Sequence, residues 1–254
     1  MIRFIRSHSN PILRRLAWLA PACIVLAAPA AETPLVAIGV TEPIFDVTLS
    51  TAVPGIISVQ KFKEGDAVKA GDVILELDKR IEELEVDRRN LVVGIRKMDL
   101  DATQVLYEKT KSVSKEELDK KRVDYAVAVV EHQMAVEALR RRLIPAPQDG
   151  IITDVLLDVG EAADAYQPVV RMVDPRRCRF ECNVEAHTAT HLALQQTIRL
   201  DIDTGATPQT VTGTVAFISP VADPASGLIN VKVQFDNPDG RIRPGLPGKM
   251  VVVH

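Results

Sequence analysis

The sequence predicts a mainly β protein with an α-helical hairpin: a small β sandwich that the hairpin splits into two halves, followed by a β barrel. Three observations support this fold class. One stretch of the 254-residue chain occurs twice, a charged segment with a helical period separates the two copies, and strand-like alternation fills the last third. An internal repeat constrains the architecture of a chain more strongly than a single motif does.

Residues 1–30 have the pattern of a cleaved signal peptide for export. Four arginines precede an apolar run over residues 16–28, and an Ala-Pro-Ala site follows at residues 28–30. A membrane-spanning helix needs about 20 apolar residues, so this run is too short to span. Without the first 30 residues the chain has 27 basic and 34 acidic residues, a net charge of −7. That charge balance does not favour nucleic-acid binding.

Residues 31–49 alternate between apolar and polar residues and are predicted to form N-terminal strands that join the barrel and sandwich region. The repeat follows. Gly55-Ile56-Ile57 and the residues up to Leu77 align without a gap, at an offset of 95, with Gly150-Ile151-Ile152 and the residues up to Met172. Two copies are too few for a solenoid. Segments 50–79 and 143–175 are therefore predicted to be the two halves of one sandwich.

Residues 80–142 are predicted to form an antiparallel coiled-coil hairpin, because apolar residues recur in both arms at the a and d positions of a heptad. In the first arm these are Ile81, Leu84, Leu91, Ile95, Met98, Ala102 and Val105, interrupted by Arg88. In the second arm they are Leu118, Tyr125, Val129, Val136, Leu139 and Leu143, interrupted by Arg122 and His132. Ser114 and Glu117 have the spacing of a capping box, which predicts that the second helix starts there.

Residues 176–254 are predicted to form a β barrel of about six strands, completed by an early segment such as Leu35–Val40. Strands are expected over 197–202, 210–218, 229–235 and 250–253, with one short helix over 184–194. Cys178 and Cys182 lie four residues apart on a further strand, roughly 13 Å from each other. A disulfide needs less than about 7 Å between Cα atoms. Both are expected to be buried free thiols, with a metal or intermolecular role left open.

The ordered set of motifs resembles the HlyD-type periplasmic adaptors, also called membrane fusion proteins, over nearly all of the chain after the signal. The matching segments are residues 53–57, 64–74, 113–119, 144–151 and 243–246. The resemblance implies a lipoyl-like sandwich and an adaptor that acts by assembly in the periplasm, without a cofactor or catalysis. It also implies a homo-oligomer that joins an inner-membrane transporter, of RND or ABC type, to a TolC-like outer-membrane channel for efflux or secretion.

The resemblance places the partner-binding site at the hairpin tip. The expected contact residues are Lys111, Ser112, Val113, Ser114 and Lys115. Pump-linked relatives often carry Arg, then Leu four residues later, then Ser seven residues after that. This chain has Thr103, Tyr107 and Ser114 at those positions, so it keeps only the Ser. Five lysines at and near the turn also predict a basic tip: Lys109, Lys111, Lys115, Lys120 and Lys121. The chain stops just after the barrel, which suggests a shortened adaptor.

Other function classes have weaker support in the sequence. His187 and His191 have i, i+4 spacing, which suits a metal site, but no third ligand is nearby and no metal site is predicted. A substrate- or metal-binding protein on an adaptor-like fold is the alternative function. Lys79 lies near the sequence position at which lipoyl and biotinyl carriers have their modified lysine. In this chain it leads into a predicted helix and is expected to be solvated. The sequence has no nucleophile elbow and no phosphate-binding glycine loop, so it gives no indication of an enzyme.

Overall fold

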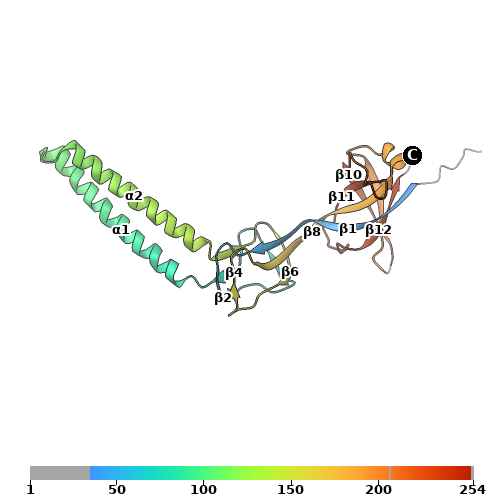
Figure 1. The fold of residues 1–254 in the computed structure, drawn as a ribbon, viewed down its shortest axis with the longest axis horizontal. Coiled ribbons are helices and arrows are strands. Elements are labelled where there is room, and N and C mark those ends of the chain that lie inside the picture. The colour runs from blue at the N-terminus through green and yellow to red at the C-terminus, as the bar shows by residue number, and fades with distance from the viewer. Residues whose placement is uncertain (1–34, 206, 253–254) are drawn as a thin grey trace, which may run out of the picture. The chain divides into compact units, whose positions relative to one another are not determined.

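The computed structural model describes residues 35–205 and 207–252 (Figure 1). The predicted signal peptide lies outside these residues. The first part of the chain forms β1 (Leu35–Ser50), β2 (Gly55–Gln60), β3 (Ala67–Val68), β4 (Val73–Leu77), α1 (Arg80–Val105), the π-helical turn η1 (Leu106–Thr110) and α2 (Lys115–Arg140). The rest forms β5 (Leu143–Pro145), β6 (Gly150–Val155), β7 (Ala162–Ala163), β8 (Pro168–Glu185), α3 (Ala186–Thr190), β9 (Thr197–Ile202), β10 (Gln209–Ile218), β11 (Leu228–Asp236) and β12 (Pro247–Val252). None of the helices within the described ranges is long and apolar enough to cross a membrane.

The barrel consists of six antiparallel strands in the order β1-β12-β9-β10-β11-β8, and β8 pairs back with β1 to close it. The prediction of a barrel completed by an early strand is therefore confirmed. Apolar residues that alternate along β8, β9 and β12 point inward, whereas on β1 the apolar Val36, Ile38 and Val40 are exposed. The fully buried side chains of this core include Phe180, Leu200, Ile202, Val215, Val233 and Met250.

Two glycines leave room for the largest side chain of the barrel core. Gly39 of β1 lies opposite Gly248 of β12 in the strand register. A Cβ atom on Gly39 would lie 2.7 Å from Cζ of Phe180, and one on Gly248 would lie 3.2 Å from Cε2 of the same ring. The Phe180 ring thus packs against bare backbone on two strands, which only glycine permits.

The sandwich has an internal symmetry that follows the sequence repeat. Gly55 pairs with Ala163, and the residues 95 positions away, Gly150 and Val68, pair in the same way. The hydrogen bond from the Ile57 amide to the Glu161 carbonyl, 2.9 Å, has a counterpart from Ile152 to Asp66, 3.0 Å. Each copy of the repeat therefore pairs with the other copy, so neither half can form the sandwich alone.

The symmetry is broken at one turn. Gly71 has a φ of +89°, and the equivalent residue 95 positions later is Tyr166, with a φ of +63°. Left-handed backbone costs a residue with a Cβ atom roughly 1–2 kcal/mol. The Tyr166 side chain is 80% exposed, so it has few contacts within the chain to offset this cost.

Replacing Tyr166 by Gly is therefore expected to raise the free energy of unfolding by about 1 kcal/mol. Urea denaturation of the purified protein measures the change. The matched control is Gly71→Tyr at the equivalent turn, which is expected to lower the free energy of unfolding by a similar amount. A loss of stability in the Tyr166→Gly variant would show that the exposed ring contributes more than the backbone strain costs.

The hairpin consists of α1 and α2, which pack side by side and antiparallel (Figure 1). Residues that are buried or half-buried recur along the facing sides of both helices. On α1 they are Val86, Val93, Leu100 and Thr103, and on α2 they are Leu118, Tyr125, Ala128, Ala135 and Leu139. Ion pairs cross the same seam between Glu82 and Arg142, between Arg89 and Glu131, and between Asp99 and Lys121. The seam thus combines apolar side chains with ion pairs.

The heptad predicted for the first helix was wrong. Ile81 is 73% exposed, Leu91 70% and Met98 65%, so the predicted stripe faces away from α2. On the second helix the prediction was wrong for Val136, which is exposed, whereas Leu118 and Tyr125 do face the seam. Hydrophobic periodicity finds the most apolar stripe of a helix. The seam on α1 is formed instead by a different, shorter set of apolar residues, Val86, Val93 and Leu100, together with ion pairs.

Candidate partner-binding site at the hairpin tip

The tip is a short, well-defined turn between the two helices. After η1, Lys111 adopts a left-handed conformation with a φ of 55°, and the chain reverses. Ser114 then caps α2, because its hydroxyl accepts a 3.1 Å hydrogen bond from the Glu117 amide. This confirms the predicted cap. It also ties the tip residues to the rigid start of a helix.

The predicted contact residues lie together on this turn. Lys111, Ser112, Ser114 and Lys115 are exposed, and Val113 is half-buried. The hydroxyl of Ser112 lies 2.7 Å from that of Thr110. The tip therefore offers hydroxyl groups and one partly covered apolar side chain to a partner, on a backbone that local hydrogen bonds hold in place.

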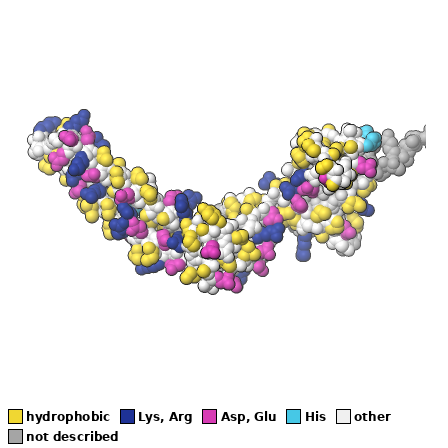
Figure 2. Space-filling view, in the orientation of Figure 1, with side chains coloured by type: hydrophobic (Ala, Val, Ile, Leu, Met, Phe, Trp, Pro, Cys, Tyr) yellow, Lys and Arg dark blue, Asp and Glu magenta, His cyan; other side chains and the backbone are white. Residues whose placement is uncertain are grey.

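The tip is less basic than its lysines suggest. The acidic residues Glu108, Glu116, Glu117 and Asp119 lie among the five lysines, and Figure 2 shows both charge types at this end of the hairpin. Lys121 pairs with Asp99 at 3.6 Å, and the ammonium of Lys111 lies 5.1 Å from the centre of the Tyr107 ring. The net charge near +1 gives little long-range attraction to an acidic partner.

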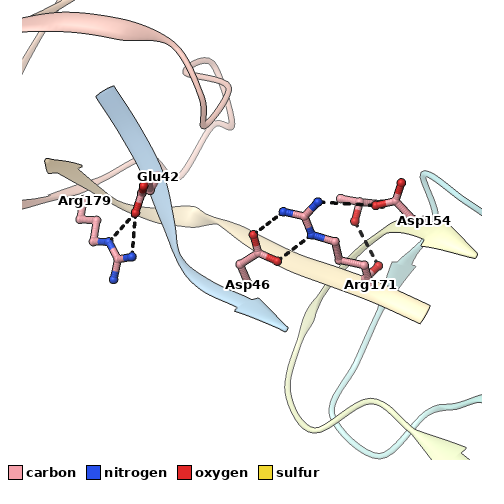
Figure 3. A network of polar contacts seen from close by, with 6 residues as sticks. Glu42, Asp46, Asp154, Arg171 and Arg179 are labelled. Atoms are coloured by element: carbon pink, nitrogen blue, oxygen red, sulfur yellow. Dashed lines mark hydrogen bonds and ion pairs between the residues drawn. The ribbon is translucent and has the colours of Figure 1, made fainter. Parts of the chain in front are cut away.

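A second polar cluster joins the barrel to the sandwich (Figure 3). β1 and β8 pair from Gly39 to Ser50, so the same two strands belong to both domains, with a bulge after Pro43. A proline has no amide hydrogen for the ladder, which explains a break there. On the sandwich side of this bulge, Arg171 of β8 donates two hydrogen bonds to Asp46 of β1, at 2.9 and 2.7 Å.

The same cluster continues on both sides of the bulge. Arg179 donates to Glu42 at 2.7 Å, and Arg171 lies 4.0 Å from Asp154. The hydrogen bonds from Arg171 hold the pKa of the Asp46 carboxyl below its usual value. The side chains of Glu42, Asp46, Arg171 and Arg179 line a groove of about 560 Å³. Because the acids and arginines neutralise one another, the groove favours neither an anion nor a cation, and we interpret the cluster as a clamp between two strands.

Comparison with known proteins identifies the family. Residues 46–175, just over half of the chain, match the family described as "RND MFP, barrel-sandwich hybrid domain", and residues 181–253 match "CusB-like, beta-barrel domain". The chain belongs to the RND-type membrane fusion proteins. The described sandwich, hairpin and barrel are the domains expected of such a protein.

Individual relatives of this membrane fusion protein are distant. The chain is 26% identical over 208 residues to an uncharacterized protein of Haemophilus influenzae, covering 80% of this chain and 52% of the relative. It is 24% identical over 213 residues to the solvent efflux pump periplasmic linker SrpA of Pseudomonas putida, covering 76% and 54%. The chain thus spans about half the length of these curated relatives.

The fold also matches solved structures. A MacA–MexA chimeric protein that contains the Pseudomonas aeruginosa MexA α-hairpin domain superposes with a TM-score of 0.76. The superposition covers 87% of this chain and 82% of that one, at 18% identity. This likeness shows a common fold and nothing about partners.

At the tip signature positions of this membrane fusion protein, one residue is buried and a second is half-buried. Thr103 is 8% exposed, and its hydroxyl donates to the Asp99 carbonyl at 2.7 Å. Tyr107 is half-buried. Thr103 is thus closed to a partner, and of the three signature positions only Ser114 is exposed. The sequence showed the substitutions but not their burial.

Lys79 is tied into the structure and is less free than the sequence suggested. Its ammonium lies 2.8 Å from Glu76 and 3.5 Å from Glu83, and the hydrogen bond to Glu76 raises the pKa of Lys79. Glu76 is 7% exposed and also pairs with Lys61; the hydrogen bonds from Lys61 and Lys79 lower the pKa of this carboxyl. Lys79 therefore holds a buried carboxylate at the start of α1.

The histidine and cysteine candidates of this membrane fusion protein lie in the barrel domain. The rings of His187 and His191 are 4.9 Å apart at the exposed end of α3. Within residues 35–205 and 207–252, they join no group of three His, Cys, Asp or Glu that would hold a metal. Cys178 and Cys182 are buried and free, and burial raises the pKa of their thiols to about 11 and about 12. Both thiols are therefore protonated at neutral pH and are poor nucleophiles.

Proposed function

We propose that this protein is a periplasmic adaptor of a tripartite efflux or secretion system, linking an inner-membrane transporter to a TolC-like outer-membrane channel. The observation that carries the proposal is the split sandwich. Its two halves can pair only if the intervening hairpin leaves and returns, so the fold presents one exposed tip on two helices of 26 residues each. Each helix extends about 39 Å at 1.5 Å per residue.

The comparisons support the transporter side of the proposal. Both matched domains belong to membrane fusion proteins, and the sandwich description names the RND type. The relative SrpA is a periplasmic linker of a solvent efflux pump. We therefore favour an RND-type transporter over an ABC-type one. The motif order shared with HlyD-type adaptors supports a role by assembly, with several copies acting together and without catalysis.

The tip contact can be tested by photocrosslinking in cells. A photoreactive residue at Ser112 is expected to form an adduct with an outer-membrane channel, because Ser112 is exposed on the turn. The matched control is Asn90, which is also exposed on the hairpin but lies about 33 Å along α1 from the tip. An adduct with the channel at Asn90 but not at Ser112, or at neither position, would contradict tip docking.

A further inference from the structure

The repeat places two charged residues at equivalent positions of the sandwich. Glu76 of β4 and Arg171 of β8 lie 95 positions apart, which is the offset of the repeat. The register of β2 with β4 shifts at Ser58, whose hydroxyl donates to the Glu76 carbonyl at 3.0 Å. The register of β6 with β8 shifts in the same way at Thr153, whose hydroxyl donates to the Arg171 carbonyl at 3.2 Å. Each half of the sandwich therefore holds one charged residue in the same local setting.

Both residues lie where the chain passes from the sandwich into a neighbouring domain. Beside Glu76, β4 leads into α1, and β5 arrives from α2 with Leu143 opposite Glu76. Beside Arg171, β8 runs on into the barrel, and β1 arrives from the barrel with Thr48 opposite Arg171. Thr48 and Leu143 are 95 positions apart as well. Two chain segments thus form the joint with the hairpin and two form the joint with the barrel, and one residue of the equivalent pair lies at each joint.

At the hairpin joint, Glu76 contacts two lysines. Its carboxylate lies 2.5 Å from the ammonium of Lys61, which follows β2, and 2.8 Å from that of Lys79. Lys79 is the N-cap residue of α1, and its ammonium also lies 3.5 Å from Glu83 in the first turn of that helix. A buried carboxylate such as that of Glu76 requires charged partners of this kind. We call Glu76, Lys61 and Lys79 the hairpin-side clamp.

At the barrel joint, Arg171 contacts two aspartates (Figure 3). It donates two hydrogen bonds to Asp46, which follows the bulge of β1, and its guanidinium lies 4.0 Å from Asp154 of β6. A bidentate pair between an arginine and a carboxylate fixes the relative orientation of the two groups. We call Arg171, Asp46 and Asp154 the barrel-side clamp. The two clamps have opposite polarity, because the central residue is an anion in one and a cation in the other.

We infer that Glu76 and Arg171 are positioning residues, and that each clamp fixes the direction in which one domain leaves the sandwich. The hairpin-side clamp sets the direction of the hairpin, and the barrel-side clamp sets that of the barrel. Domain motions take place at a few residues near the ends of elements. Each joint here has only two chain segments, so the charged side chains beside them restrain how far the joint bends. Neither clamp depends on the identity of the channel or of the transporter.

Distances between pairs of spin labels on the purified full chain test the two clamps separately. A label at Ala162→Cys marks the sandwich. The second label marks the hairpin at Ala126→Cys or the barrel at Thr212→Cys, and all three residues are exposed. The native Cys178 and Cys182 are buried, so the labels attach to the introduced thiols. With both clamps intact, the sandwich-to-hairpin distance and the sandwich-to-barrel distance are each expected to be narrowly distributed.

Glu76→Gln is expected to lose the narrow sandwich-to-hairpin distance and to keep the narrow sandwich-to-barrel distance. The neutral side chain leaves the charges of Lys61 and Lys79 uncompensated, and the two ammonium groups then repel each other. Arg171→Gln is expected to give the opposite result, because only the barrel-side clamp loses its central charge. A residue that merely stabilises the fold would not separate the two distances in this way.

The matched controls are Glu85→Gln and Arg199→Gln. They make the same chemical changes in ion pairs that lie within a single element, since Glu85 pairs with Arg88 on α1 and Arg199 pairs with Asp201 on β9. Both distances are expected to stay narrow in both controls. A clamp variant that broadens its distance no more than its control, or that broadens both distances equally, would overturn the inference.

Two further variants test whether the clamps act through their ion pairs. Asp46→Asn and Arg171→Gln, alone and combined, are expected to broaden the sandwich-to-barrel distance to the same width, because the loss of either partner already breaks the pair. A double variant broader than both single variants would overturn the inference. At the other joint, Lys79→Gln leaves Glu76 paired with Lys61, so the buried carboxylate keeps a partner. This variant is expected to broaden the sandwich-to-hairpin distance, and an unchanged distance would contradict the hairpin-side clamp.

Discussion

Replacing Phe180 by Ala is expected to lower the free energy of unfolding of the barrel by about 3–5 kcal/mol. The Phe180 ring is 0% exposed and packs against the backbone at Gly39 and Gly248. Its loss would leave a cavity beside two residues without side chains, so no neighbouring side chain on those strands can move in to fill it. Urea denaturation followed by circular dichroism measures the change.

Phe217 provides the control for this substitution. It lies on β10 of the same barrel, but its side chain is 43% exposed. Phe217→Ala is expected to cost no more than about 1 kcal/mol, since surface substitutions have small effects. Similar losses for the two variants would mean that the Phe180 ring is not the centre of the barrel core.

Adding a single methyl group at Gly39 is expected to be about as damaging. A Cβ atom at Gly39 would lie 2.2 Å from the backbone oxygen of Glu181 and 2.7 Å from Cζ of Phe180. Backbone oxygen cannot rotate away as a side chain does, so strands β1 and β8 would have to separate. Overpacking of this kind typically costs 1–3 kcal/mol and sometimes more, and we expect about 3 kcal/mol for Gly39→Ala.

The control has the opposite expected sign. Gly94 lies inside α1, and a Cβ atom there would meet no atom within 4 Å. Alanine favours a helix over glycine by about 1 kcal/mol, so Gly94→Ala is expected to stabilise the protein by that amount. The two substitutions add the same methyl group. If both changed the unfolding free energy in one direction, helix propensity and packing would not explain the difference between the sites.

Many elements of the fold could be predicted from the sequence because their signals are local. The strand over residues 197–202 alternates strictly and was found with the bounds that the structure has. The capping serine at residue 114 and the two hairpin arms follow from spacing alone. The repeat at an offset of 95 residues predicted one sandwich from two halves, since similar segments adopt similar conformations.

The candidate site was predictable only in part. The tip turn could be located from its position between two helical patterns, but the burial of Thr103 could not, because it depends on which side of α1 faces α2. The pairing of Asp46 with Arg171 joins residues 125 positions apart, and neither residue has a sequence signal for the other. That pairing exists because β1 and β8 continue from one domain into the next.

The sequence by itself determined the order of the elements, the internal repeat and the amphipathic character of both hairpin helices. Only the tertiary structure decided which stripe of each helix faces its partner. Hydrophobic periodicity measures how apolar a stripe is, whereas the residues at the helix contact depend on how the two helices pack against each other. Ala128 and Ala135 are buried in the seam, and ion pairs such as Arg89–Glu131 bridge the helices. Large apolar residues occur on both sides of the helices: Leu118 lies in the seam, whereas Leu91 and Met98 lie on the outer edge.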